Sequence, residues 1–204
     1  MSPVSRLESQ RQTRSALLVA AQHEFSERGF LDAALERIAD RAGYTRGAIY
    51  KNFSDKYDLF YAVLTDWITR HTRALSRDLA AAREGTPQLD VLQAWFDSYL
   101  VPQSLTVAYT EFCAAAATRP HARTLLAQHQ QTIRTQIAAL IDDYCAYAHI
   151  ALPIPSEHFA ALVAALATGL ANQRSLDPAA VPGELYANAL TYLWSGMLAA
   201  PPSA

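Results

Sequence analysis

The stretch LERIADRAGYTRGAIYKNF, residues 35–53, decides the fold of this chain. Apolar residues recur in it every three or four positions, which is the spacing of one face of an α-helix. Gly43 divides it into two short segments, because glycine readily adopts the left-handed backbone that ends a helix and permits a tight turn. Thr45 is then the expected N-cap of the second segment. Two short helices joined in this way are typical of a helix-turn-helix, whose second helix enters the major groove of DNA.

The same stretch also fits an ordinary helical hairpin. Ala39 is small enough to let two helices cross closely, and Ile49 supplies the apolar contact that fixes the crossing. Any such hairpin needs a turn glycine and small residues, so the motif alone leaves both interpretations open.

Helical periodicity continues on both sides of this stretch. Upstream, Leu17, Ala21 and Phe25 form the apolar stripe of a helix that ends at Gly29. Downstream, Ser54 opens a long helix, and further helices are expected over residues 88–100, 105–118, 122–149, 157–173 and 183–198. The pattern predicts an all-α fold of about nine helices. We expect an N-terminal three-helix domain over residues 1–54 and a larger helical domain over residues 55–204.

Composition narrows the class of protein. The chain has 204 residues, 51% of them hydrophobic, which is enough to bury a core without disulfides. The net charge is −2, but residues 1–54 carry eight Arg/Lys against six Asp/Glu, and the rest nine against thirteen. A DNA-binding surface is therefore expected to be local and N-terminal. We expect a cytoplasmic protein, because its two cysteines form no Cys-x-x-Cys pair and its N-terminus is polar. We expect no membrane span, because no apolar run is long enough to cross a membrane.

No constellation in the sequence is typical of an enzyme. Phosphate-cradling glycine loops, a Gly-x-Ser-x-Gly elbow and a His-Glu-x-x-His pair are missing from the sequence. The best combination is Cys145 with His149 and the nearby Asp142, which lacks further ligands at a recognisable spacing. We expect no catalytic residues, no metal and no cofactor.

The segments RSALLVAAQHEFSERGF and LERIADRAGYTRGAIYKNFSDKYDLFYAVL closely resemble the N-terminal domain of the tetracycline repressor (TetR) family. The resemblance covers residues 14–64. Its carrying residues are Ala20, Ala21, Phe25, Gly29, Phe30, Ile38, Ala39, Ala42, Gly43, Thr45, Gly47, Ile49, Tyr50, Phe53, Lys56 and Leu59. The rest of the chain resembles the family in length, helical content and the pattern of its last two helices.

The resemblance implies that residues 35–53 bind operator DNA. The implied DNA-binding residues are Thr45, Arg46, Gly47, Ala48, Tyr50, Lys51, Asn52 and Lys56. Arg46 is the best candidate to read a guanine edge through two hydrogen bonds. Thr45 and Lys56 are expected to reach phosphates at helix starts, and Gly47 lets the backbone approach the DNA.

Two departures from the family put the backbone contacts in doubt. Ala33 and Ala34 stand where the family often has two hydroxyl residues, so the cap of the second helix and its phosphate contact are missing. Asp32 is the substitute cap, although an acidic cap repels DNA. Asn52 stands where the family usually has His or Tyr. DNA affinity is then expected to depend more on Arg46, Lys51, Lys56 and an N-terminal arm with Arg6, Arg11 and Arg14.

The larger domain is expected to bind a small, largely apolar or aromatic effector and to form the homodimer. The candidate ligand-binding residues are Trp67, His71, Trp95, Phe96, Tyr99, Tyr109, Phe112, Cys113 and Tyr144; for each of them plain core packing is the competing interpretation. The last two helices are expected to pair across a two-fold axis, as a palindromic operator requires. The function predicted is a ligand-released repressor; the alternative is a ligand-binding helical protein with weakened or lost DNA binding.

Overall fold

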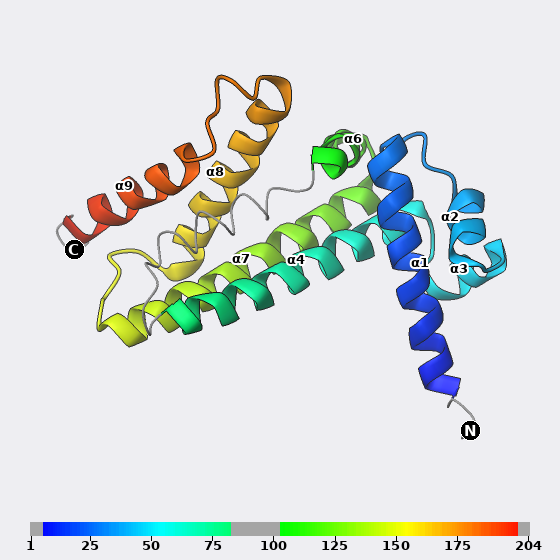
Figure 1. The fold of residues 1–204 in the computed structure, drawn as a ribbon, viewed down its shortest axis with the longest axis horizontal. Helices are drawn as coiled ribbons and strands as arrows, with labels where there is room; N and C mark the ends of the chain where they lie inside the picture. The colour runs from blue at the N-terminus through cyan, green and yellow to red at the C-terminus, as the bar shows by residue number, and fades with distance from the viewer. Residues whose placement is uncertain (1–5, 83–102, 200–204) are drawn as a thin grey trace. The chain divides into compact units, whose positions relative to one another are not determined.

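The structure, a computed structural model, describes residues 6–82 and 103–199 of the chain. Within these ranges it consists of eight α-helices and no strand, so the all-α prediction is confirmed (Figure 1). The helices are α1 (Arg6–Arg28), α2 (Leu35–Ala42), α3 (Arg46–Asn52), α4 (Lys56–Ala82), α6 (Gln103–Thr118), α7 (Pro120–Ala148), α8 (Ser156–Leu176) and α9 (Leu185–Ala199). The helix expected over residues 88–100 lies outside the described residues.

Local sequence signals account for most of the helix ends. Gly29 and Gly43, with φ of +76° and +74°, follow the last residues of α1 and α2 in the left-handed conformation that glycine favours. At the start of α4, the Asp58 amide donates to Asp55 Oδ1 over 2.8 Å, and the Ser54 amide donates to Asp58 Oδ2 over 2.9 Å. The first of these hydrogen bonds satisfies an amide that a helix leaves unpaired at its first turn, and the second ties the preceding chain to that turn.

The chain divides into two compact units. The first consists of residues 1–67 and 103–129, and the second of residues 68–102 and 130–204. Each of the long helices α4 and α7 is divided, with one segment in the first unit and the other in the second. The functional boundary expected between residues 54 and 55 stays a prediction.

An aromatic cluster forms the centre of the first unit. Phe25, Phe30, Phe60 and Phe112 are each at most 1% exposed. Their ring centroids lie 4.8 Å apart for Phe25 and Phe60, 5.3 Å for Phe30 and Phe60, and 5.1 Å for Phe60 and Phe112. Tilted and edge-on pairs at such separations contribute about 0.5 to 1.5 kcal/mol each beyond the burial of their area. The cluster joins α1, α4 and α6 with Phe30, which follows Gly29.

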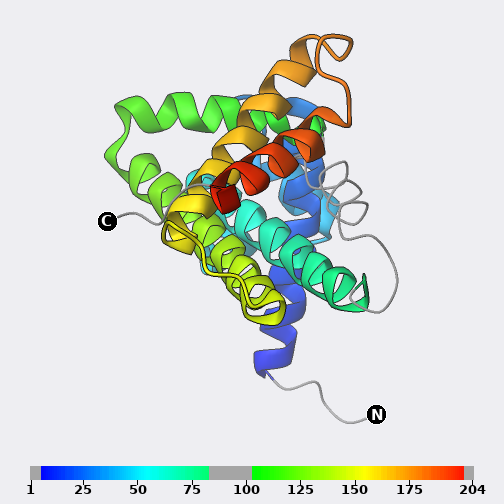
Figure 2. The ribbon, with the colours of Figure 1, turned by 90° about the vertical axis from the view of Figure 1, so that its left-hand side faces the viewer.

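In the second unit, polar contacts join α4 to α7 and aromatic contacts join α7, α8 and α9. Thr72, which is 6% exposed, donates to Gln136 Oε1 over 2.7 Å. The Trp194 ring lies 5.5 Å from that of Tyr144 and 5.7 Å from that of Phe159. Helices α8 and α9 lie side by side in both views (Figures 1 and 2).

Two properties of the described residues bear on the class of protein. None of the helices in residues 6–82 and 103–199 combines the length and apolar character of a membrane span. The same residues contain no group of three or more His, Cys, Asp or Glu side chains that could hold a metal ion. The Asp142 carboxylate, named above as a possible ligand, accepts a hydrogen bond from Ser156.

Candidate nucleic-acid interface

Helices α2 and α3 form a helix-turn-helix whose turn is closed by backbone hydrogen bonds. The Gly43 amide donates to the Asp40 carbonyl over 3.1 Å, and the Tyr44 amide donates to the Ala39 carbonyl over 2.9 Å. Ile38, Ala39 and Ile49 are at most 1% exposed, so these apolar residues of the two helices are buried in the core. The turn at Gly43 predicted from the sequence is confirmed.

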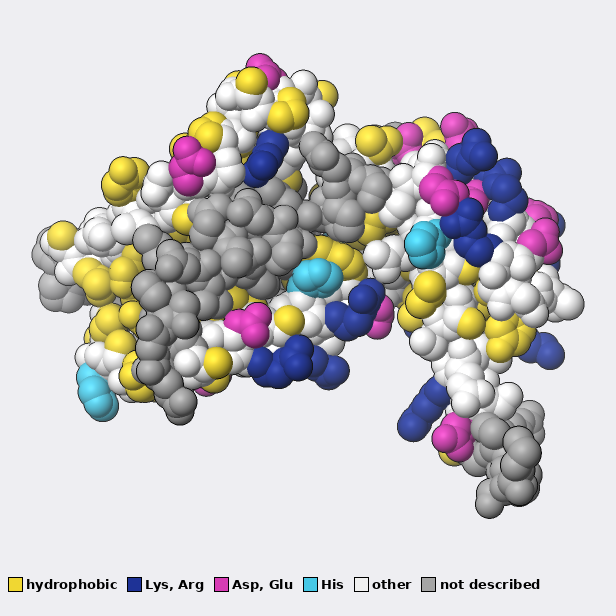
Figure 3. Space-filling view, in the orientation of Figure 1, with side chains coloured by type: hydrophobic (Ala, Val, Ile, Leu, Met, Phe, Trp, Pro, Cys, Tyr) yellow, Lys and Arg dark blue, Asp and Glu magenta, His cyan; other side chains and the backbone are white. Residues whose placement is uncertain are grey.

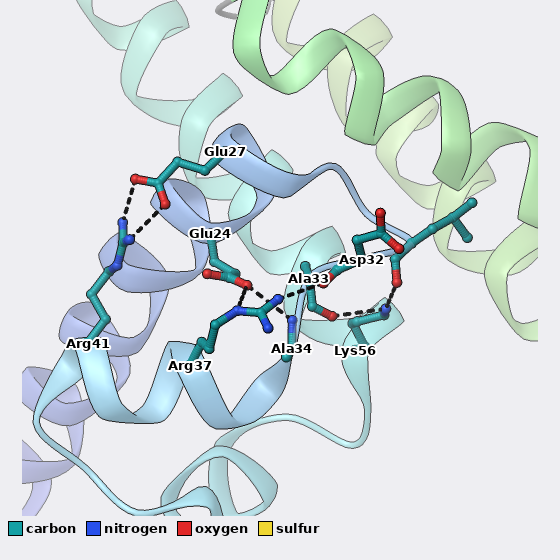
Figure 4. Close-up of polar contacts among 9 residues, drawn as sticks. Glu24, Glu27, Asp32, Ala33, Ala34, Arg37, Arg41 and Lys56 are labelled. Atoms are coloured by element: carbon teal, nitrogen blue, oxygen red, sulfur yellow. Dashed lines mark hydrogen bonds and ion pairs between the residues drawn. The ribbon is translucent and has the colours of Figure 1, made fainter.

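The start of α2 is capped by a residue from α1. Ala34 is the N-cap, with extended backbone and no side-chain cap. Its amide donates to Glu24 Oε1 over 3.2 Å, and the Arg37 Nε donates to the same oxygen over 2.6 Å (Figure 4). Glu24 is only 2% exposed. The expectation that Asp32 caps α2 was wrong, because the N-cap is Ala34 and its amide donates to Glu24. Asp32 contributes its backbone carbonyl, which accepts a hydrogen bond from Arg37.

Helix α3 exposes the residues that the sequence assigned to DNA and buries those between them. Thr45, Arg46, Gly47, Tyr50 and Lys51 are exposed, and Ala48 and Asn52 are half-buried. Ile49 and Phe53, at 0% and 2% exposed, anchor the helix to the core. Thr45 occupies the N-cap position of α3, and its hydroxyl makes no capping hydrogen bond. The exposed side of α3 therefore carries hydrogen-bonding groups and one approachable backbone position, Gly47.

Two neighbours hold the Arg46 guanidinium. Its Nη2 donates to Tyr50 Oη over 3.0 Å, and its Nη1 forms an ion pair with Glu36 of α2. The guanidinium carbon lies 5.5 Å from the centre of the Tyr50 ring. The hydrogen bond to Tyr50 and the charge of Glu36 raise the pKa of Arg46 above its ordinary value. Arg46 is a permanent cation with two neighbouring partners.

The end of α3 is held by Arg14 of α1. Arg14 Nη1 donates to the Asn52 carbonyl over 3.0 Å, and its guanidinium lies 4.3 Å from the centre of the Phe53 ring. The Asn52 side chain donates to the Ala48 carbonyl over 2.8 Å. Arg14 and Asn52, both expected to contribute to DNA binding, thus make contacts within the protein that fix the far end of α3.

Lys56, another expected phosphate contact, binds the loop between α1 and α2. Its Nζ donates to the Leu31 carbonyl over 2.9 Å and to the Ala33 carbonyl over 3.2 Å (Figure 4). The ammonium also lies 5.0 Å from the centre of the Phe30 ring. Burial lowers the pKa of Lys56. In this structure the ammonium therefore holds the loop residues that lead into α2.

A carboxylate from α6 binds the other side of the same loop. Glu111 Oε2 accepts hydrogen bonds from the Phe30 amide over 2.6 Å and from the Leu31 amide over 2.9 Å. A Cβ at Gly29 would lie 2.8 Å from this oxygen, so a side chain there would force the carboxylate to shift. No sequence signal pointed to Glu111, because its partners lie 80 and 81 positions away.

Positive and negative side chains mix on the surface of α1, α2 and α3 (Figure 3). Arg41 binds Glu27 through two hydrogen bonds of 2.7 and 3.0 Å, and these lower the pKa of Glu27. In contrast, Lys51 makes no hydrogen bond or ion pair with any residue that the structure describes. The surface of α1, α2 and α3 is therefore not uniformly basic, in line with the small excess of Arg and Lys in residues 1–54.

The structure places the candidate effector-binding residues in different surroundings. Phe112 is fully buried within the aromatic cluster, and Trp67 is 6% exposed. Tyr109 and Cys113 are partly exposed neighbours on α6, and burial raises the pKa of the Cys113 thiol. His71 and Tyr144, both half-buried, belong to the second unit. Trp95, Phe96 and Tyr99 lie outside the described residues.

His129 of α7 is a buried polar residue that the sequence reasoning missed. Its side chain is 5% exposed, and its ring centroid lies 6.1 Å from that of Tyr109. No hydrogen-bond partner of its Nδ1 lies among the described residues. Burial lowers the pKa of His129 to about 4. The available signal was its place on one apolar face with Leu125 and Ile133.

Sequence comparisons agree with this geometry. Residues 17–63 match the model described as bacterial regulatory proteins, tetR family, and residues 88–198 match that of the BetI-type transcriptional repressor, C-terminal. The repressor BepR of Brucella suis biovar 1 is 49% identical over 53 residues, which are 26% of this chain and 25% of BepR. The activator FasR of Mycolicibacterium smegmatis is 33% identical over 85 residues, or 41% of this chain and 39% of FasR. The matched stretches thus span well under half of these relatives.

Solved structures share the fold over almost the whole chain. A TetR-family transcriptional regulator from Rhodococcus sp. aligns with a TM-score of 0.72 at 21% identity, covering 93% of this chain and 100% of that one. Salmonella enterica GusR aligns with a TM-score of 0.64 at 23% identity, covering 92% of this chain and 96% of that one. Family matches to both ends of the chain, the second spanning more than half of it, fit the helix-turn-helix described above. The chain belongs to the tetR family of bacterial regulatory proteins.

Proposed function

We propose that this regulator binds a palindromic operator through α2 and α3 as a homodimer, and represses transcription until a small molecule releases it. The observation that carries the proposal is the surface of α3. Thr45, Arg46, Tyr50 and Lys51 are exposed above a helix that Ile49 and Phe53 anchor in the core. A rigid helix with exposed donors is what reading base edges in the major groove requires.

Repression is favoured over activation by the description of the matched families. The model that matches residues 88–198 is described as that of a transcriptional repressor. BepR is named a repressor and FasR an activator, so relatives of the N-terminal segment include both. The proposal places the protein with the chromosome, in the cytoplasm.

The homodimer is proposed to form through α8 and α9. These helices and the loop between them expose several large apolar side chains, and yellow side chains gather on this part of the surface (Figure 3). The most exposed are Leu162 at 50%, Leu176 at 86%, Tyr192 at 74% and Leu198 at 47%. Contiguous exposed apolar area on a globular protein marks an interaction surface. Pairing it across a two-fold axis gives the symmetry of a palindromic operator.

The effector is proposed to be uncharged and largely apolar or aromatic. Tyr109, Cys113 and His129 bring a few polar groups together in apolar surroundings, and His129 is neutral at pH 7 because of its lowered pKa. Release would follow if the effector binds one arrangement of the protein better than the operator-bound arrangement. Equal effector affinity with and without operator would contradict this coupling.

Weakened or lost DNA binding is the alternative function. It is favoured by the contacts of Arg14, Asn52 and Lys56 within the protein, since these side chains were expected to contribute to DNA binding. One experiment separates the two functions. The duplex upstream of the gene, labelled with a fluorophore, is titrated with protein at two salt concentrations beside a scrambled duplex, and then with a panel of neutral aromatic compounds.

The proposal predicts tighter binding to the upstream duplex than to the scrambled one. Binding should weaken as salt rises, because each neutralised phosphate releases counterions. At least one neutral aromatic compound should release the duplex. Equal, weak binding to both duplexes would favour the alternative function.

A further inference from the structure

Glu36 is an acidic residue on the exposed surface of the helix-turn-helix, beside the arginine expected to read a base. It lies in the first turn of α2, where a carboxylate is favoured by the helix dipole. Its side chain nevertheless contacts the next helix, as an ion pair with Arg46. The two side chains are 55% and 56% exposed, so both are accessible to a partner.

The geometry leaves the guanidinium able to bind more. Glu36 and Tyr50 engage Nη1 and Nη2 of Arg46, one partner each. A guanidinium has five N–H donors, so donors remain for a base edge. A long arginine without these neighbours would sample many rotamers, and most of its partners on DNA would be phosphate oxygens.

We propose that Glu36 is a specificity-determining residue, which acts as a positioning residue through Arg46. It orients the guanidinium towards a base edge, and its negative charge opposes binding to phosphates. The inference rests on the proposed DNA-binding function. Two residues of this surface then have different roles. Lys51, which has no partner among the described residues, contributes affinity for any DNA. Glu36 contributes discrimination between sequences.

The test replaces the carboxylate by its neutral isostere and measures base preference. Wild-type protein first selects a duplex from a random-sequence library. Dissociation constants are then measured at one salt concentration for this duplex and for versions in which single base pairs of one half-site are changed. Glu36→Gln is compared with Glu27→Gln, which removes the same charge from an exposed carboxylate on α1. The Glu27 side chain is 50% exposed and is paired with Arg41.

Glu36→Gln is expected to lower the preference at one base pair about five-fold or more, the lower limit for a two-bond contact between arginine and guanine. It should also tighten binding to scrambled DNA, because the surface loses a negative charge. Glu27→Gln should change binding to all duplexes by a similar factor and leave each base preference as in the wild type.

A second comparison tests whether Glu36 acts through Arg46. In an Arg46→Ala background, Glu36→Gln should no longer change the preference at that base pair, since the group it orients is missing. An unchanged preference in Glu36→Gln, an equal loss in Glu27→Gln, or the same effect without Arg46 would each overturn the inference. If the wild type selects no duplex, the proposed function fails and this inference fails with it.

Discussion

At the residue scale, α2 shows how a cap can be supplied from outside its own segment. The rule that places a hydroxyl or carboxylate at the N-cap looks only at neighbouring residues. Because Ala33 and Ala34 carry no such group, the rule predicted Asp32 as the cap. In the structure the Ala34 amide donates to Glu24, ten positions earlier. Glu24 is almost fully buried and also pairs with Arg37, so loss of the Arg37 side chain would leave a buried charge uncompensated. The cap could not be predicted from sequence, because it depends on how α1 and α2 cross.

Adding a local cap at Ala34 should stabilise the protein. Its backbone, with φ of −114° and ψ of 132°, already has the extended conformation of an N-cap. We expect Ala34→Ser to raise the free energy of unfolding by about 0.5 to 1 kcal/mol, because the hydroxyl can accept from an amide of the first turn. Urea unfolding at one protein concentration measures it. Ala33→Ser is the control, since Ala33 is 5% exposed and a hydroxyl there is buried away from the cap position. Equal effects of the two changes would show that capping is not the cause.

His129 should make the stability of the protein depend on pH. Burial lowers its pKa to about 4 in the folded protein, below the ordinary value of 6.5. The unfolded chain therefore takes up a proton between pH 6.5 and 4 that the folded protein does not, and stability falls as the pH decreases through this range. For this group alone, the free energy of unfolding should be about 2 kcal/mol lower at pH 5 than at pH 7.

Urea unfolding of His129→Gln at both pH values tests this effect. The variant should lose about 2 kcal/mol of the pH dependence, whatever its stability at pH 7. His158→Gln, at an exposed histidine, serves as the control and should keep the wild-type dependence. The same dependence in His129→Gln as in the wild type would contradict the assignment.

At the scale of elements, the loop between α1 and α2 is held from both sides. Glu111 accepts two of its amides, and Lys56 donates to two of its carbonyls. The ends of α1 and α2 were predictable, because Gly29 and Gly43 are local signals. Helix α4 begins at Lys56, two residues after the expected Ser54. The partners of the loop were not predictable, since α6 comes next to it through tertiary packing, including that of Phe112 against Phe30 and Phe60.

Substitution of the two helix-ending glycines should separate backbone strain from the contact with Glu111. Both have a positive φ, but a Cβ at Gly43 meets nothing within 4 Å, whereas one at Gly29 lies 2.8 Å from Glu111 Oε2. Gly43→Ala should lower the free energy of unfolding by about 1 kcal/mol through strain alone. Gly29→Ala should cost more, because the carboxylate must also move.

The double variant Gly29→Ala with Glu111→Ala checks the source of the extra cost. In the Glu111→Ala background, Gly29→Ala should cost about as much as Gly43→Ala does in the wild type. Denaturant unfolding of the wild type, the three single variants and the double variant gives the comparison. Equal costs for Gly29→Ala with and without Glu111 would mean that the carboxylate does not require glycine there.

At the scale of the whole molecule, the all-α class followed from helical periodicity, and the family followed from the resemblance that covers residues 14–64. The surroundings of the candidate effector-binding residues did not. An aromatic residue on a helix looks the same in sequence whether it is core, as fully buried Phe112 is, or partly exposed, as Tyr144 is. His129 was missed because a histidine among apolar positions has no local signature of its burial.

The proposed dimer makes a prediction at this scale. Tyr192→Glu should dissociate it, because Tyr192 is 74% exposed on α9 and a charge there would be buried in the interface. Sedimentation should give twice the 22.4 kDa chain mass for the wild type and the chain mass for the variant. Val107→Glu, at a residue of α6 that is 57% exposed, is the matched control and should remain dimeric. A monomeric wild type at micromolar concentration would contradict the dimer.

The central claim is that residues 35–53 read DNA through α3. The most direct measurement is the ratio of the dissociation constants for a scrambled and a selected duplex, at one salt concentration, for wild type and Arg46→Ala. The account predicts a wild-type ratio of about 1,000 or more. In Arg46→Ala the ratio should fall about 30-fold or more, because two copies of the arginine each contribute at least about 1 kcal/mol. A wild-type ratio near one, or an unchanged ratio in Arg46→Ala, would contradict it.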